Sequence, residues 1–198
     1  MIVLCKEKIK AYKDYLKDNL SKKRYVHSLN VAETAVELAK KFDGDVDKCC
    51  LAGLLHDVSK ELESERQLCY VNNSELDVCD VEKNAPPLYH AIAGAEQVKE
   101  LFHIDDEDIV NAIRYHTTAR ENMSKTEQII YLADLVSQDR EYKDVKRMRK
   151  IAFSDMEKAM YEALKFSIND SVQKGNTIPH KTLSAYNQYA KLMKQRKE

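Results

Sequence analysis

Glycine and proline are scarce in this chain, and their scarcity limits the folds that are open to it. The 198 residues include 4 Gly and 3 Pro, whereas average usage would give roughly 24 such residues in a chain of this length. Sandwiches and barrels with many strands need these residues in their turns, and collagen-like or linker-rich chains need still more of them. We therefore expect an all-α fold.

Charge and hydropathy narrow the class of protein. The chain is 43% hydrophobic, which is enough for a real core in one domain. Lys and Arg number 32 against 33 Asp and Glu, so the formal net charge is -1 and no global basic field favours nucleic acid. No apolar stretch approaches the roughly 20 residues of a membrane span, and the run at residues 1–4 is too short for a signal-peptide core. These features favour a cytoplasmic protein.

The cysteines indicate neither disulfides nor a zinc finger. The 5 Cys are odd in number and include no Cys-x-x-Cys pair. We therefore expect reduced thiols that are mostly buried as small hydrophobic side chains.

Apolar spacing and capping residues predict a series of helices. Ser21 is a candidate N-cap, and Ser64-x-x-Gln67 and Ser124-x-x-Glu127 have the capping-box spacing. Residues 72–87 are polar and end in two prolines, so we expect a loop there. The predicted helices cover residues 9–20, 21–42, 46–58, 64–70, 88–102, 105–116, 124–133, 144–172 and 181 onward.

Two acidic residues fall directly after apolar runs. His56-Asp57 follows the run at residues 51–55, and an ionised carboxylate at the end of a buried run needs compensation, which a divalent metal supplies most completely. The alternative is an Asp that ends the helix and faces water. Asp134 follows the run at residues 129–133, at a helix end where the macrodipole disfavours an acid.

Basic residues accompany these positions. Arg24 and His27 are spaced i, i+3, so they project together as an anion clamp and a ligand would. The alternative there is a solvated basic helix start. Lys60 follows His56 by four residues, where it could meet a phosphate if the helix continues.

Together, six residues from five helical ends form a candidate metal centre. Their mixture of imidazole and carboxylate suits a mononuclear or dinuclear site for iron, manganese or a similar ion. No thiolate is required, which speaks against structural zinc. The six residues are His27, His56, Asp57, His90, His116 and Asp134. His103 is expected on the surface.

His27, His56-Asp57 and Asp134, in this order, resemble the His...His-Asp...Asp signature of the HD-domain metal-dependent phosphohydrolases. Within that superfamily the chain is similar to the YqeK-type symmetrical diadenosine tetraphosphate hydrolases over nearly its whole length. The strings that carry the similarity are KRYVHS at 23–28, AGLLHDVSK at 52–60, LYHA at 88–91, IRYHTT at 113–118, IIYLAD at 129–134 and TLSAYN at 182–187.

The resemblance implies an all-helical HD domain with a core at residues 21–140, and C-terminal helices at 144–198 that pack on it and close the nucleotide site. It implies two metal ions, iron first, held by the six residues with Asp57 bridging; manganese, cobalt and nickel suit the same donors. Asp57 and Lys60 would be catalytic. The implied substrate-binding residues are Arg24, His27, Lys60, His90, Thr117, Arg140, Thr177, Ile178, Pro179, His180, Lys181, Thr182 and Asn187.

The chain departs from the family pattern in two places. Ala119 stands where the family usually has Gly after two threonines, and Ser137-Gln138-Asp139 stands where it usually has a Glu-Pro step before Arg140. Both changes leave the six proposed ligands untouched and alter a loop expected to contact phosphate.

The resemblance thus implies a hydrolase that cleaves diadenosine tetraphosphate symmetrically into two ADP by attack of metal-activated water. The alternatives are an HD-domain phosphohydrolase for another nucleotide, such as a deoxynucleoside monophosphate or an alarmone, and a non-catalytic nucleotide-binding regulator. The expected partners are the nucleotide and its nucleoside diphosphate product, with a homodimer as one option and no nucleic acid or membrane. The basic cluster at residues 143–150 is interpreted as an exposed helix face.

Overall fold

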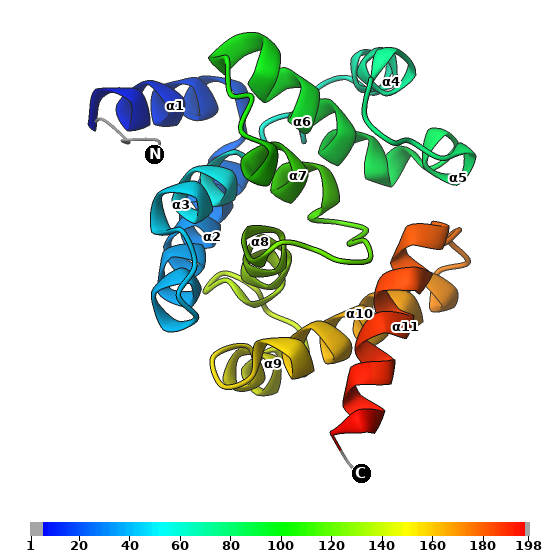
Figure 1. The fold of residues 1–198 in the computed structure, drawn as a ribbon. Helices are drawn as coiled ribbons and strands as arrows, with labels where there is room; N and C mark the ends of the chain where they lie inside the picture. Colours follow the sequence, from blue (N-terminus) through cyan, green and yellow to red (C-terminus); the bar gives the residue numbers. More distant parts are fainter. Residues whose placement is uncertain (1–5, 197–198) are drawn as a thin grey trace.

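The computed structural model describes residues 6–196, which form α-helices and one short 3₁₀ helix, with no strand among them (Figure 1). The expectation of an all-α fold is confirmed. The run at residues 1–4 and Cys5 lie outside the described residues. In chain order the elements are α1 (Lys6–Asn19), α2 (Lys22–Lys41), α3 (Val46–Leu55), α4 (Ser64–Asn73), α5 (Asp80–Lys83), η1 (Pro86–Leu88), α6 (Tyr89–Phe102), α7 (Glu107–Tyr115), α8 (Lys125–Val136), α9 (Val145–Ala152), α10 (Met156–Gln173) and α11 (His180–Gln195).

Two of the predicted helix starts are confirmed by their caps. The Ser21 hydroxyl accepts a hydrogen bond from the backbone N–H of Arg24 at the start of α2. Ser124 and Glu127 form both bonds of a capping box at the start of α8. The capping box predicted at Ser64 is wrong, because Glu63 is the N-cap of α4 and Gln67 is buried with other partners.

Three predictions about where helices lie are also wrong. The helix expected over residues 144–172 is two helices, because the chain turns after α9 and the carboxylate of Asp155 caps α10 by accepting from the backbone N–H of Lys158 at 3.0 Å. The loop expected at 72–87 contains α5 and η1. The third predicted helix ends at Leu55 rather than at residue 58, so His56 is its C-cap.

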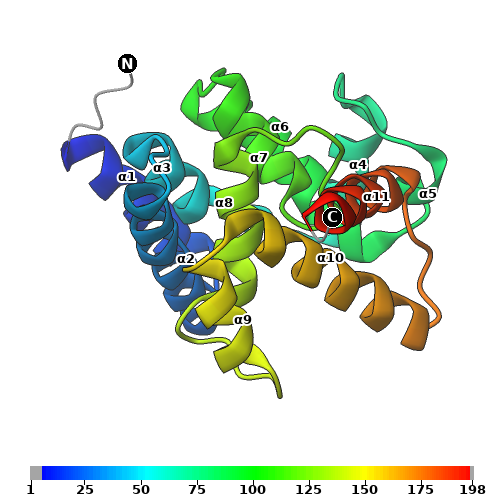
Figure 2. The ribbon, with the colours of Figure 1, turned by 60° about the horizontal axis from the view of Figure 1, so that its bottom comes forward.

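Helix α8 lies at the centre of the molecule (Figure 1) and packs against α2, α3, α7, α9 and α10. Its run of Ile129, Ile130, Tyr131, Leu132 and Ala133 is buried on all sides, which fits a helix that is apolar all round. Helix α10 extends away from this centre, and α11 packs along it (Figure 2). The last turn of α8, which carries Asp134, is therefore held from several directions.

Gly53 allows α2 and α3 to cross closely. A Cβ atom at this position would lie 3.0 Å from the Cα of Ala32 and 3.2 Å from the carbonyl oxygen of Val31. Both of these atoms belong to the backbone, so they cannot rotate away as the end of a side chain could. The crossing brings the end of α3, with His56, against the first half of α2, with His27.

Four cysteines lie in the described part of the chain, and all are free thiols. Cys49 is buried, and burial raises the pKa of its thiol to about 12. Cys50 and Cys79 are half-buried and Cys69 is exposed, so the expectation that the thiols are mostly buried is wrong for the described cysteines, of which only Cys49 is buried. No helix among residues 6–196 is long and apolar enough to cross a membrane.

The close crossing at Gly53 predicts a specific cost of substitution. We expect Gly53→Ala to lower the free energy of unfolding by about 1–3 kcal/mol, because the new methyl group forces two backbones apart. The matched control is Gly94→Ala in α6. Both variants gain about 1 kcal/mol of helix propensity, but the atom nearest a Cβ at Gly94 belongs to the side chain of Ile113, at 3.3 Å, rather than to a backbone. Chemical denaturation measures both, and equal stability of the two variants would contradict the prediction.

Candidate metal centre

The turn after α3 presents His56 and Asp57 to the interior. His56 is fully buried, and its Nδ1 donates a hydrogen bond to the carbonyl oxygen of Gly53 at 2.8 Å. Its other ring nitrogen, Nε2, has no hydrogen-bond partner. The Gln67 side chain holds the turn from behind by donating to the carbonyl oxygens of Ser59 at 2.9 Å and Leu62 at 3.0 Å.

Asp57 lies between two pairs of histidines. Its Oδ2 is 3.4 Å from His56 Nε2 and 4.0 Å from His27 Nε2. Its Oδ1 is 3.5 Å from His90 Nε2 and 3.7 Å from His116 Nε2. The two oxygens of one buried carboxylate therefore face opposite ways, toward donors from four different segments.

Asp134 completes the side of the cluster that holds His27 and His56. Its Oδ1 lies 2.9 Å from His27 Nε2 and 3.8 Å from His56 Nε2. On the other side, the Nε2 atoms of His90 and His116 are 3.2 Å apart, and His116 Nδ1 donates to the carbonyl oxygen of Ile113 at 2.7 Å. The structure thus brings together all six residues that the sequence marked as candidate ligands.

These residues fit a metal ion by two independent features. The Nε2 of His56 is a buried nitrogen that makes no hydrogen bond, with Asp57 Oδ2 at 3.4 Å, and buried polar atoms without a hydrogen bond are rare in folded proteins. Ligand atoms of His27, His56 and Asp134 lie within 4.8 Å of one another, as do those of His56, Asp57 and His116. Imidazole and carboxylate donors in this arrangement suit first-row divalent metals.

Three basic side chains surround the cluster. Arg24 Nη1 donates to Asp57 Oδ2 at 2.7 Å, and Arg140 donates both to the Asp134 carboxylate and, through Nε, to its carbonyl oxygen at 2.7 Å. Lys60 Nζ lies 3.1 Å from His90 Nε2. Both guanidinium groups are part-exposed, so they can also meet an anion that arrives from solvent.

The electrostatics keep the carboxylates ionised. Burial would raise the pKa of Asp57, but His56 and His116 hold it well below its usual range. Burial opposes ionisation of Asp134 as well, yet the hydrogen bond to His27 and the charge of Arg140 lower the pKa of that carboxyl. Burial and the charge of Lys60 lower the pKa of His90, which keeps this imidazole neutral and able to bind a metal.

Two cavities reach the cluster. One of about 710 Å³ opens beside α2 and is lined by Lys23, Arg24, His27, Asp139, Arg140, Glu141 and Tyr142. A smaller one of about 200 Å³ is lined by His116, Thr117, Tyr131, Asp134, Leu135 and Ser167. The Thr117 hydroxyl in this smaller cavity is buried without a hydrogen-bond partner.

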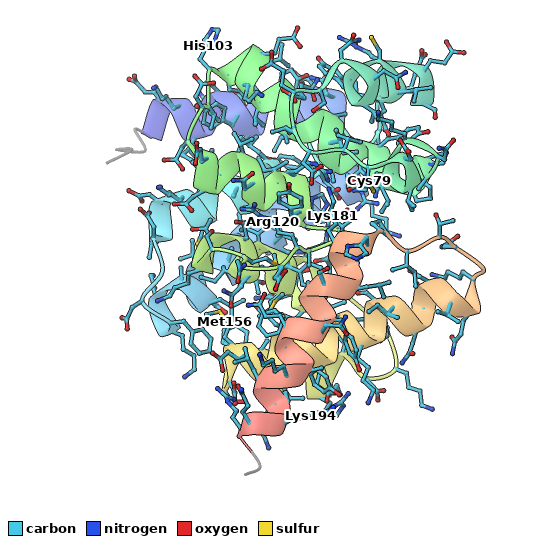
Figure 3. The ribbon with its side chains drawn as sticks, turned by 45° about the vertical axis from the view of Figure 1, so that its right-hand side comes forward. Cys79, His103, Arg120, Met156, Lys181 and Lys194 are labelled. Atoms are coloured by element: carbon cyan, nitrogen blue, oxygen red, sulfur yellow. The ribbon has the colours of Figure 1, made fainter. Side chains whose placement is uncertain are left out.

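Lys181 at the start of α11, an expected substrate contact, is bonded to other residues of the chain. Lys181 Nζ bonds Glu82 Oε2 at 3.0 Å and the carbonyl oxygen of Asp77 at 2.9 Å, and it lies over the Tyr115 ring. Figure 3 shows Lys181 beside Arg120, whose guanidinium also covers Tyr115. Lys181 thus anchors α11 in this structure, because its ammonium group is already occupied.

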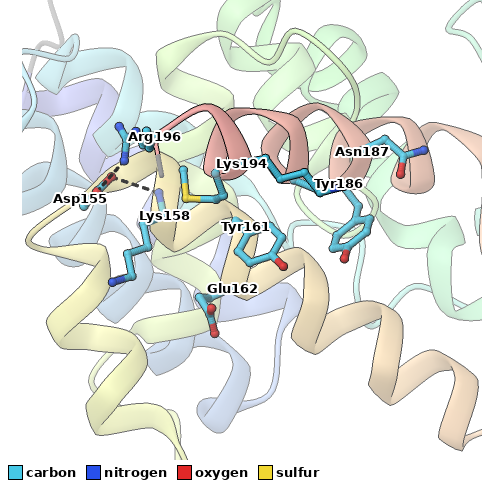
Figure 4. Close-up of a pocket in the computed structure, with 10 residues that line it drawn as sticks. Asp155, Lys158, Tyr161, Glu162, Tyr186, Asn187, Lys194 and Arg196 are labelled. Carbon is cyan, nitrogen blue, oxygen red and sulfur yellow. Dashed lines mark hydrogen bonds and ion pairs between the residues drawn. The ribbon is translucent and has the colours of Figure 1, made fainter. Parts of the chain in front are cut away.

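The remaining C-terminal candidates divide into buried and exposed residues. Thr182 is buried with an unpartnered hydroxyl, and Pro179 is also buried. Thr177 and His180 are exposed, as is Asn187, and Ile178 is half-buried. Asn187 lines a separate cavity of about 730 Å³ between α10 and α11, along with Tyr161 and Tyr186 (Figure 4).

Sequence reasoning missed Asp139 as a contact of the cluster. Its Oδ2 accepts a hydrogen bond from His27 Nδ1 at 2.7 Å. The only signal in the sequence was an acidic residue directly before Arg140, in the segment that departs from the family pattern. The side chain of His103, by contrast, is exposed at the end of α6, as expected.

Comparison with known proteins places this arrangement in a family. The HD domain model matches residues 24–139, which include all six clustered residues. Proteins named symmetrical bis(5'-nucleosyl)-tetraphosphatase are 36% identical in Halalkalibacterium halodurans, over 87% of this chain and 92% of the relative, and 36% identical in Staphylococcus aureus, over 91% and 94%.

A solved structure agrees. A crystal structure from Clostridium acetobutylicum, described as a predicted HD superfamily hydrolase involved in NAD metabolism, matches with a TM-score of 0.88 and 39% identity. The match covers 92% of this chain and 97% of that one. The chain therefore belongs to the HD domain family and, within it, to the group of relatives named symmetrical bis(5'-nucleosyl)-tetraphosphatase.

Proposed function

We propose that this chain hydrolyses diadenosine tetraphosphate symmetrically and releases two ADP. The observation that carries the proposal is Asp57, whose two oxygens face two different pairs of histidines beside Arg24. Hydrolysis of a polyphosphate depends on positioning and on compensating the charge of phosphate oxygens, and metal donors beside cations serve both needs. The names of the relatives support the substrate.

The centre would hold two metal ions, with iron as the first choice and manganese, cobalt or nickel as ions that the same donors accept. His27, His56 and Asp134 would hold one ion, His90 and His116 the other, and Asp57 would bridge them. Two ions so held lower the pKa of a water molecule and neutralise charge on the attacked phosphate. The distances of Oδ1 and Oδ2 of Asp57 to its four histidine neighbours support this division.

The three basic residues would bind the tetraphosphate. Arg24 and Arg140 are part-exposed at the 710 Å³ cavity, so they can transfer from carboxylate to phosphate oxygens without crossing the core. Lys60 would donate to the ADP that leaves and so stabilise the charge that develops on it. Its position over His90 places this ammonium group at the centre itself.

The helices after residue 144 would form one domain with the HD core and close the nucleotide site. The buried, unpartnered hydroxyl groups of Thr117 and Thr182 support a polar ligand near these positions. Lys181 would hold the segment in place through Glu82. We propose a cytoplasmic enzyme, acting on a nucleotide rather than a nucleic acid, and gel filtration would test whether it is a homodimer.

The products of the reaction test the proposed function. We expect metal-loaded protein to convert diadenosine tetraphosphate into ADP alone, because attack at the central linkage leaves two equal halves. Chromatography of the reaction mixture measures this, with a deoxynucleoside monophosphate and an alarmone as comparison substrates. AMP and ATP as products would refute the symmetrical reaction. Faster turnover of a comparison substrate would refute the proposed substrate.

Metal removal should abolish turnover reversibly. We expect a chelator to remove two ions per chain together with the activity, since the donor set divides about Asp57. Elemental analysis gives the number of ions, and re-addition of iron, manganese, cobalt or nickel in turn shows which restore the rate. Full turnover by protein shown to lack metal would exclude this mechanism.

Two substitutions should separate metal binding from phosphate binding. Asp57→Ala is expected to lose metal and activity together, because both halves of the centre share this carboxylate. Lys60→Ala is expected to keep both ions and to lose about 10²–10³-fold in rate, as when one electrostatic donor is removed from an active site. Loss of metal from Lys60→Ala would assign Lys60 to the structure of the centre instead.

A further inference from the structure

Asp139 engages α2 with both carboxylate oxygens, and no step of the proposed reaction uses it. Its Oδ2 accepts from His27 Nδ1 at 2.7 Å, and its Oδ1 accepts from Asn30 Nδ2 at 3.2 Å. Asn30 follows His27 by three residues on α2, so the two donors lie on one face of the helix. The carboxylate therefore contacts the face that presents His27 to the cluster.

Two other ligand histidines, which lie at helix C-termini, are fixed in a different way. His56 and His116 are the C-caps of α3 and α7, and their Nδ1 atoms donate to carbonyl oxygens three residues earlier at 2.8 and 2.7 Å. Carbonyl groups at a helix C-terminus have no partner within the helix, so they are free to accept. His27 lies inside α2, where the backbone carbonyls are already bonded, and it needs a partner from elsewhere in the chain.

Arg149 holds the backbone of residues 136–140, the segment that contains Asp139. Arg149 in α9 donates from Nε to the carbonyl oxygen of Val136 at 2.8 Å and from Nη2 to those of Ser137, Gln138 and Arg140 at 2.5, 3.2 and 3.0 Å. Three of these carbonyl groups precede Asp139 in the sequence and one follows it, so Arg149 fixes the backbone on both sides of Asp139. The basic stretch at residues 143–150, expected only as an exposed face, thus contributes one residue that fixes the backbone beside the metal centre.

We propose that Asp139 is a positioning residue that sets the ring of His27 and strengthens its Nε2 as a metal donor, an inference that rests on the metal centre of the proposed function. With Nδ1 donating to Asp139, Nε2 is the ring nitrogen of His27 that is left for an ion. It faces Asp134 at 2.9 Å and Asp57 at 4.0 Å, and it would exchange its hydrogen bond to Asp134 for the metal. A carboxylate behind a ligating imidazole raises its basicity and fixes its orientation. The residue acts through His27 and not on the substrate.

Metal affinity tests the inference without relying on hydrolysis. Competition against a chelating indicator should show that Asp139→Ala binds one of its two ions about 10–100-fold more weakly, the range for loss of such a partner, while the other ion keeps its wild-type affinity. Asp139→Asn keeps an acceptor at the same place but loses the charge, so we expect a smaller loss. Glu141→Gln is the matched control, because it removes the same charge from a neighbour in the same cavity.

The outcomes distinguish this inference from the proposed function. Wild-type affinities in both Asp139 variants, or an equal loss in Glu141→Gln, would overturn the role of Asp139. Absence of metal from the wild-type protein would instead refute the metal centre. Thermal unfolding in excess chelator detects any loss of stability, and should Asp139→Ala fail to fold, the affinity of Asp139→Asn decides the matter.

Discussion

The arrangement of the candidate metal centre depends on one buried negative charge. Asp57 is nearly inaccessible to solvent and ionised, and an isolated carboxylate in such a place would be very costly. The chain meets this cost with histidines from four segments and with Arg24. An arrangement that serves only to neutralise Asp57 would close the 3.4 Å between its Oδ2 and His56 Nε2 into a hydrogen bond, and this bond is not formed. The cluster is therefore better explained as a set of ligands than as an ion-pair network.

Much of the fold was predictable because local rules determine it. The shortage of glycine and proline indicated helices, and Ser21 and Ser124 marked two helix starts that the structure has. The six clustered residues were identifiable because their chemistry is unusual at the ends of apolar runs and because their order resembles a known family. The cap at His56 is an exception, because the predicted helix continued to residue 58 whereas α3 ends at Leu55.

What the sequence could not predict depends on contacts between distant segments. Asp139 meets His27 across 112 positions, and Lys181 meets Asp77 across 104, so no spacing rule connects them. The break before α10 was missed because residues 153–155 contain neither glycine nor proline, and Asp155 acts as the cap. Gln67 looked like half of a capping box, yet its amide is used to hold the turn that carries Asp57.

The crossing at Gly53 has a consequence for anyone who would move this centre into another scaffold. Gly53 carries no side chain, yet besides accepting a hydrogen bond from His56 Nδ1 it sets how near the helix of His56 can come to the helix of His27. A designed bundle that copied all six ligands but placed a larger residue at this crossing would hold the two imidazoles too far apart to share an ion. A transplanted centre therefore needs the backbone spacing at this crossing as well as the six ligands.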